Sequence, residues 1–270
     1  MRAAVTDPVA PTARVPARRA TGWVPDQHGA WAMLVVPVLA GVWLVGPAPV
    51  HLALGAFWFV GYLAFYALGR WLRSRRRRRQ LPPLLVYGAL AAPLGITTLM
   101  LAPQLVRWVP VYVPLLAAST LLMLRRQERS LSNDVVTVLA AGLMTPVVVD
   151  AAGGPLGVAT WVATGALTAY FLGTVPYVKT MIRERGRVAY VRGSVAYHLA
   201  GTVAAAVLAA TAWQSWWLVV VWVLLTGRAV AGPAVNTRRE RPLRPVVVGV
   251  GEVVASVVVL VTVLTGLPAA

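Results

Sequence analysis

Two ionisable residues stand inside long apolar stretches of this 270-residue sequence. Glu252 follows Pro245 by seven residues, and His198 follows Val191 by seven residues. If these stretches are membrane-spanning helices, both side chains lie about 10 Å inside the membrane. An ionisable group at such a depth costs about 2.5–3.5 kcal/mol on insertion scales, so it should face a cavity or a partner. The two residues therefore predict either a polar pocket or a neutral, hydrogen-bonded pair that holds two helices together.

A second group of residues has the chemistry to bind an anion. Lys179 and Arg183 are four residues apart, so they share one helical face and could grip a phosphate or a carboxylate. The alternative interpretation is that they are positive charges on a frayed helix end. His28 opens the first apolar segment, where free helix amides favour an anion, although its polar neighbours are equally typical of a helix cap. We expect one ligand site that faces the cytoplasm and contains His28, Tyr177, Lys179, Arg183, His198 and Glu252.

Three carboxylates near the same helix ends could bind a hard cation. Glu128 and Asp134 flank a short polar turn, and Glu184 follows the segment of Lys179. Carboxylate and amide oxygens are the ligands that Mg²⁺ and Ca²⁺ prefer. The candidate metal ligands are therefore Glu128, Asp134 and Glu184. The alternative is a charged turn in which Ser132, Asn133 or Asp134 caps the next helix.

The composition indicates what kind of protein must position these residues. Hydrophobic residues make up 59% of the chain and charged residues only 12%, with a mean hydropathy of +0.71. Soluble domains contain roughly 45–50% apolar and about 25% charged residues, so this chain has too little polar surface for one. The chain contains no cysteine, which excludes disulfides, thiolate metal sites and a cysteine nucleophile.

The apolar residues fall into segments of the length that spans a membrane, which is about 20 residues. We predict an all-α fold, a polytopic transmembrane bundle of about nine helices. The segments cover residues 30–45, 50–68, 84–101, 108–124, 135–149, 156–178, 191–211, 214–230 and 245–267.

The distribution of basic residues predicts the orientation of this bundle. Lysine and arginine number 25 against 8 acidic residues, a net charge of +17. If the N-terminus lies inside, 24 of the 25 basic residues fall in the tail and in the loops after helices two, four, six and eight, and only Arg107 lies outside. Basic loops face the cytoplasm, so we expect the N-terminus inside and the C-terminus outside the plasma membrane. These loops are expected to contact anionic lipid headgroups and not nucleic acid.

The domain organisation follows from the same pattern. Residues 1–25 are rich in alanine, proline and arginine and show no apolar periodicity, which predicts a disordered basic tail. Residues 26–270 contain no long polar interruption. We therefore expect a single multi-pass transmembrane domain from residue 26 to residue 270.

Several motifs resemble those of the YwiC-like family of bacterial integral membrane proteins. They are the run 27–33 (Gln-His-Gly-Ala-Trp-Ala-Met), the pair Asn133-Asp134, the run 177–184 (Tyr-Val-Lys-Thr-Met-Ile-Arg-Glu) and the pair Tyr197-His198. The resemblance extends from about Asp26 to the C-terminus. It implies a multi-pass protein of the bacterial inner membrane, and it implies no particular reaction.

A more distant architectural likeness is to UbiA-type prenyltransferases, which also have nine helices and a cytoplasm-facing cavity. Their chemistry uses two aspartate-rich motifs that hold Mg²⁺ and a diphosphate. The loop after the second segment here carries arginines and no acid, and the loop after the sixth carries Glu184 alone. We therefore expect a protein that binds an anionic or amphipathic small molecule. The alternatives are a lipid-diphosphate transferase with a rebuilt Mg²⁺ site and a transporter of a small solute or ion.

Overall fold

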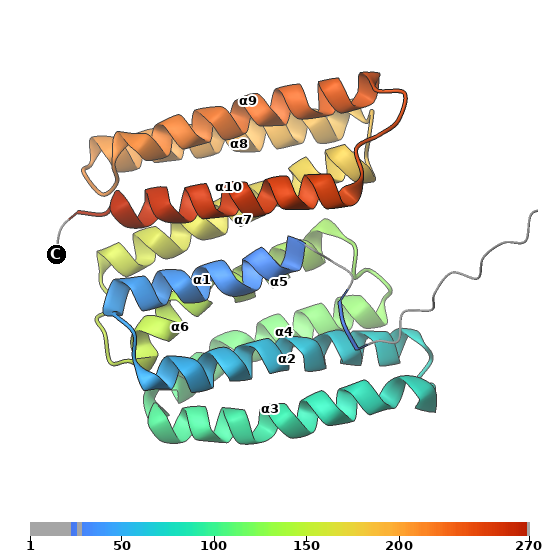
Figure 1. Cartoon of the computed structure of the whole chain (residues 1–270), viewed down its shortest axis with the longest axis vertical. Helices are drawn as coiled ribbons and strands as arrows, with labels where there is room; N and C mark the ends of the chain where they lie inside the picture. Colours follow the sequence, from blue (N-terminus) through green and yellow to red (C-terminus); the bar gives the residue numbers. More distant parts are fainter. Residues whose placement is uncertain (1–22, 26–28, 269–270) are drawn as a thin grey trace, which may run out of the picture.

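The computed structural model describes residues 23–25 and 29–268, and this part of the chain is helical and contains no strand (Figure 1). Its first half contains α1 (Gly29–Val45), α2 (Pro49–Arg73), η1 (Arg78–Gln80), α3 (Leu81–Leu101), η2 (Pro103–Trp108) and α4 (Val109–Leu124). Its second half contains α5 (Leu131–Gly142), α6 (Met144–Ala151), α7 (Val158–Ile182), α8 (Val188–Ala210), α9 (Trp216–Arg238) and α10 (Pro245–Thr265).

The described part of the chain contains an apolar helical segment at each of the nine predicted positions. Eight segments are long and apolar enough to span a membrane, and α5 and α6 together form one of them, Leu131–Ala151. The ninth, α1, is shorter at 17 residues but equally apolar. The all-α polytopic fold is confirmed, and the chain is a multi-pass membrane protein.

The loops divide the bundle into two chemically different ends. The connections at residues 74–80, 125–130, 183–187 and 239–244 contain most of the arginines and lie together on the right in Figure 1. We call this side the basic end. The opposite end carries the α1–α2, α3–α4, α6–α7 and α8–α9 connections and the C-terminal end of α10. The direction in which the bundle crosses the membrane stays a prediction.

Arg107, the exception in the charge pattern, is at the opposite end and has a dedicated counter-ion. Its Nε donates to Asp150 Oδ2 at 2.8 Å and its Nη2 pairs with Oδ1. Trp108 Nε1 also donates to Asp150 Oδ2, at 2.7 Å. The Asp150 carboxylate is buried, so these three donors replace the water that it has lost. The contact fixes η2 against α6.

The break between α5 and α6 is caused by a proline. Pro146 has no amide hydrogen, so the carbonyl of residue 142 loses its helical partner, and the helix is interrupted at Leu143. Thr145 is fully buried beside this break and donates its hydroxyl to the carbonyl of Pro37 on α1, at 3.1 Å. The interruption therefore supplies a hydrogen bond between two helices inside the bundle.

Close packing against α6 depends on a glycine of α1. A methyl group at Gly41 would lie 2.5 Å from Val148 Cβ and 2.7 Å from the carbonyl oxygen of Thr145. Real carbon atoms do not approach so closely, so only glycine permits this separation of α1 and α6. Small residues at helix interfaces are typical of membrane bundles.

The helix α7 lies in the middle of the bundle and positions the candidate site. It packs against α5 and α6 on one side and against α8, α9 and α10 on the other, as Figure 1 shows. Tyr170, Phe171 and Tyr177 are among its buried side chains. A helix with contacts on both sides is expected to be apolar around most of its circumference, as this one is.

One predicted boundary was wrong in a way that matters for function. The eighth apolar segment was expected to end at residue 230, with Arg228 near the membrane surface. Instead, α9 continues to Arg238, so Arg228 lies ten residues, or about 15 Å, from the helix end. Arg228 is therefore an interior residue of a membrane-spanning helix.

Candidate functional site

The main polar feature inside the bundle is an ion pair between α9 and α10. Arg228 Nη1 donates to Glu252 Oε1 at 2.5 Å. The side chain of Glu252 is 9% exposed and that of Arg228 is 23% exposed. Glu252 points into the bundle, as its position in the sequence predicted. A carboxylate at this depth requires a partner, and the structure identifies that partner as an arginine.

Two tyrosines of α7 complete the surroundings of the ion pair. The guanidinium carbon of Arg228 lies 4.1 Å from the centre of the Tyr177 ring, which is a cation–π geometry. The hydroxyl of Tyr170 donates to the main-chain carbonyl of Glu252 at 3.2 Å and lies 3.2 Å from Ser256 Oγ. Ser256 Oγ also donates to the Glu252 carbonyl, at 2.7 Å. The polar cluster of Tyr170, Tyr177, Arg228, Glu252 and Ser256 thus joins α7, α9 and α10.

Several polar atoms of this cluster are buried without a hydrogen-bond partner in the described structure. They are Nε and Nη2 of Arg228 and Oε2 of Glu252. Arginine carries five N–H donors, and a buried donor without an acceptor is costly. The pair therefore balances its charges, yet it retains hydrogen-bonding capacity that protein groups do not satisfy.

His198 lies in the same half of the bundle but is not the partner of Glu252. Its Nδ1–H donates to the carbonyl of Ser194, one turn earlier on α8, at 2.7 Å. Its ring lies 6.0 Å from those of Tyr197 and Trp222, and its Nε2 faces Gly173 of α7. The expectation that His198 would serve as the proton partner of Glu252 was wrong, because Arg228 occupies that place. The burial of His198 inside the bundle is confirmed.

The predicted anion-binding residues Lys179 and Arg183 do not join Tyr177. Tyr177 and Lys179 are two positions apart on α7, about 200° around the helix. Lys179 Nζ lies 2.7 Å from Asp134 Oδ2 of α5 and donates to the carbonyl of Arg129 at 3.2 Å. Arg183 is exposed at the C-terminal end of α7. The sixth predicted site residue, His28, lies outside the described residues.

The three candidate metal ligands are held in three separate ion pairs. Glu128 pairs with Arg73 at 3.1 Å, Asp134 with Lys179 at 2.7 Å and Glu184 with Arg187 at 2.6 Å. Among the described residues, no three histidine, aspartate or glutamate side chains are grouped so that they could hold a metal ion. These carboxylates therefore offer a Mg²⁺ ion no shared site in this structure.

The polar residues of the turn between α4 and α5 cap a helix and form hydrogen bonds within the turn. Ser130, and not one of the three residues predicted as caps, caps α5, because its Oγ accepts from the amide of Asn133 at 3.2 Å. The Asn133 side chain accepts from Ser119 at 2.8 Å and donates to the carbonyl of Glu128 at 3.0 Å. Burial acts to raise the pKa of Glu128, but its own backbone amide, Arg73 and Arg129 outweigh burial and lower the pKa overall.

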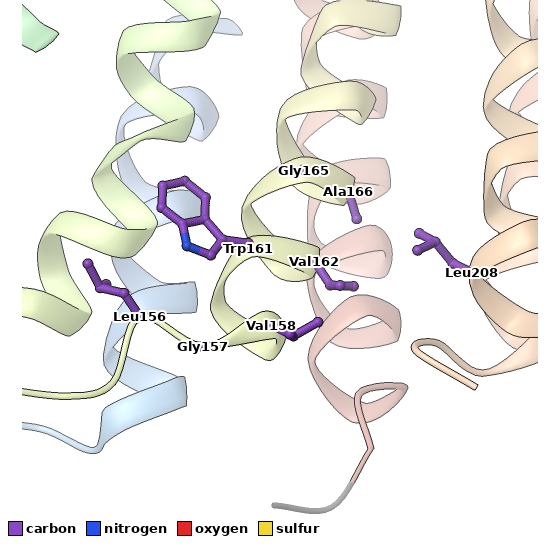
Figure 2. A pocket seen from close by; sticks show the side chains of 8 residues that line it. All are labelled: Leu156, Gly157, Val158, Trp161, Val162, Gly165, Ala166 and Leu208. Carbon is purple, nitrogen blue, oxygen red and sulfur yellow. The ribbon is translucent and has the colours of Figure 1, made fainter. Parts of the chain in front are cut away.

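The described cavities lie apart from these charges and are apolar. The larger, of about 550 Å³, is open to the surface beside the N-terminal half of α7. Figure 2 shows Trp161 on one side of it and Leu208 of α8 on the other. A second cleft of about 290 Å³ continues along α7 between Leu139 and Leu172. Neither cleft is lined by a charged residue.

Arg228, the central cation of the polar cluster, is not among the site residues predicted from the sequence. A signal was present, because Arg228 stands alone, ten residues before the next arginine, while the other basic loops contain clusters. An isolated arginine before a cluster indicates that the helix continues to the cluster. The two tyrosines of α7 are seven residues apart, a spacing that places them on one face.

Comparison with known proteins identifies relatives of this chain. The family model described as YwiC-like protein matches residues 24–149, a region that ends before α7. A Bacillus subtilis (strain 168) protein, described as uncharacterized protein YwiC, is 32% identical over 179 residues, which cover 65% of this chain and 74% of the relative. A Haemophilus influenzae protein, described as uncharacterized, is 29% identical over the same shares of both chains. No solved structure shows a significant match. By these similarities, the chain belongs to the YwiC-like family of proteins.

Proposed function

We propose that this membrane protein binds a small organic anion inside its helix bundle, with Arg228 as the residue that holds the anionic group. The observation that carries the proposal is the state of Arg228, whose Nε and Nη2 are buried without an acceptor in the described structure. Guanidinium presents its donors as a planar fork that matches a carboxylate or a phosphate. An ionisable residue inside a membrane is a functional candidate because its presence costs stability.

The surroundings of Arg228 favour a monocarboxylate with an apolar body. The guanidinium already bonds to one carboxylate, that of Glu252, so its position is compatible with a carboxylate ligand. The Tyr177 ring beside it packs in a buried apolar cluster with Met181, Ala229 and Val248. Almost a quarter of the Arg228 side chain remains accessible, which leaves a ligand a route to it.

The sequence predicts that Lys179 and Arg183 bind the anion, and we place the anion at Arg228 instead. Lys179 already has a carboxylate partner in Asp134 and a carbonyl partner in Arg129. Arg228 has a carboxylate partner but also two unsatisfied nitrogens. Tyr177 and Glu252 keep their proposed places in the site. His198 lies at a similar depth, but its Nδ1 hydrogen bond goes to Ser194 and not to either charge.

Benzoate is a suitable probe because it combines one carboxylate with an aromatic body. We expect titration calorimetry of the purified protein to show benzoate binding that Arg228→Gln weakens at least tenfold. Charge-assisted hydrogen bonds are worth about 1.5–3 kcal/mol each, and about 1.4 kcal/mol is a factor of ten. The control Arg192→Gln removes the same charge from an exposed position of α8 and should bind as the wild type does.

Two results would contradict this proposal. One is equal benzoate affinity of the wild type and Arg228→Gln. The other is loss of binding in Lys179→Gln with binding retained in Arg228→Gln, which would return the site to Lys179 and Arg183. If Arg228→Gln alone unfolds, the charge-neutral double variant Arg228→Gln/Glu252→Gln replaces it in the same titration.

The transferase alternative receives no support from a described contact. The carboxylates that it would need for Mg²⁺ each pair with a different basic residue. The transporter alternative is compatible with an interior anion site, and flux of labelled benzoate into liposomes that contain the protein would distinguish a carrier from a binding protein.

A further inference from the structure

The charge of Arg228 is already balanced by Glu252, and this balance constrains how an anion can bind. We infer that the site takes up one proton with each monovalent anion, because Glu252 must be neutralised before the anion can replace its carboxylate on Arg228. This inference rests on the proposed function and adds the proton as the second ligand of the same site.

Charge balance inside the bundle is the basis of this inference. The pair of Arg228 and Glu252 has no net charge, so an added monovalent anion would leave one uncompensated negative charge. Such a charge is poorly tolerated in a low-dielectric interior. If the buffered solution supplies a proton that forms an O–H bond on the Glu252 carboxylate, the ion pair opens and the anion pairs with Arg228. The net charge is then again zero, and the step involves no oxidation or reduction.

Among the described residues, the helices that pack against α10 carry no other carboxylate that could substitute for Glu252. The helix α10 packs against α1, α7 and α9. In α1 there is no titratable residue, and α7 presents the neutral hydroxyl groups of Tyr170 and Tyr177. The basic residue that α9 presents is Arg228 itself. His198 is on α8, which does not pack against α10, so it is not placed to take over the role of Glu252.

The helices can remain in place while the ion pair opens. Tyr170 and Ser256 donate their hydroxyls to the main-chain carbonyl of Glu252. These bonds are therefore independent of the charge on the carboxylate. Tyr170 continues to hold α10 against α7 when Glu252 is protonated, so only the two charged side chains need to move.

Benzoate titration at several pH values tests the coupling. Between about pH 5.5 and pH 8 benzoate stays ionised, because ordinary carboxyl groups titrate near about pH 4. Calorimetry in two buffers of different ionisation enthalpy gives the number of protons taken up. For the wild type we expect one proton per benzoate and an affinity that falls up to tenfold for each unit of rising pH. This measurement requires no variant.

The variant Glu252→Gln separates the coupling from binding itself. Its side chain is permanently neutral, so it should bind benzoate with no proton uptake and with no dependence on pH across this range. The control Glu240→Gln removes an exposed carboxylate of the α9–α10 loop and should behave as the wild type does.

The outcomes distinguish the two proposals. Benzoate binding without proton uptake in the wild type, with the same affinity in Glu252→Gln, would overturn the coupling and leave the anion site intact. Absence of benzoate binding in the wild type at every pH would overturn the anion site and the coupling with it.

Discussion

The guanidinium of Arg228 on α9 and the carboxylate of Glu252 on α10 are joined at 2.5 Å inside the helix bundle. Arg228 lies about 15 Å from the end of its helix at Arg238, and Glu252 lies about 10 Å from the start of its helix at Pro245. The two helices are consecutive and antiparallel, so these depths bring the side chains together. A polytopic protein that buries an arginine at this depth must neutralise it, and this pair does so.

Removing either partner of this ion pair should destabilise the protein, but the size of the loss should depend on pH for one partner only. In Arg228→Gln, the unpaired Glu252 can become neutral by binding a proton, so the loss of stability should shrink as the pH falls. In Glu252→Gln, the unpaired Arg228 stays charged at every accessible pH, so the loss should not shrink. Breaking a buried pair costs about 3–5 kcal/mol. Thermal unfolding at about pH 8 and about pH 5 measures both effects, and a parallel response of the two variants would contradict this expectation.

Gly41→Ala should destabilise the bundle because the added methyl group would meet Val148 and the backbone of Thr145. Overpacking of this kind costs about 1–3 kcal/mol. A methyl group added at Gly88 in α3 would have no atom within 4 Å apart from the local backbone of its own helix, so Gly88→Ala should be neutral or stabilising by up to about 1 kcal/mol. Thermal unfolding in one detergent compares them. Equal melting temperatures for both variants would show that α1 and α6 are not in close contact.

The turn between α4 and α5 should lose stability in acid through Glu128. The pKa of Glu128 is lower in the folded protein than its ordinary value, so its contribution is complete above the unfolded pKa of about 4.3. That contribution is lost as the pH falls through the folded pKa. Between about pH 6 and pH 3, the melting temperature of the wild type should therefore fall more than that of Glu128→Gln. An equal fall in both would exclude Glu128 as a source of acid sensitivity.

The orientation of the bundle can be tested with reporter fusions. The positive-inside rule predicts that a reporter after Gln80, at the basic end, is cytoplasmic and that a reporter after Ala270 is external. Alkaline phosphatase and a fluorescent protein report opposite sides of the membrane. Cytoplasmic signals from both positions would contradict the orientation and require an even number of crossings between the two points.

The sequence alone was sufficient to predict the helical segments, because apolar runs of spanning length and arginine-rich loops alternate along the chain. The prediction was wrong at the end of α9. An unpaired arginine would have to lie near the membrane surface, so the segment was predicted to end close to Arg228, but Arg228 is paired and the helix continues to Arg238. Its partner, Glu252, is 24 positions away, and a local hydropathy pattern contains no information about that contact. The interior charge became visible only with the packing of α9 against α10.

The candidate site was predicted in part for a similar reason. Glu252, His198 and Tyr177 are buried in the bundle, as their apolar contexts indicate. The sequence predicts one site that contains both Lys179 and Tyr177, yet the structure turns Lys179 toward Asp134 and Tyr177 toward Arg228. Sequence proximity predicted which helix carries the residues, and only the arrangement of neighbouring helices determines what each side chain contacts.

The position of a bound anion would test the proposed site at Arg228 most directly. A crystal structure with 4-bromobenzoate allows the bromine to be located by its anomalous scattering. We expect a bromine peak beside Tyr177, with the carboxylate about 2.7–2.9 Å from nitrogens of Arg228. A bromine peak beside Lys179 and Arg183, or only in the apolar clefts along α7, with Arg228 still paired to Glu252, would contradict this site.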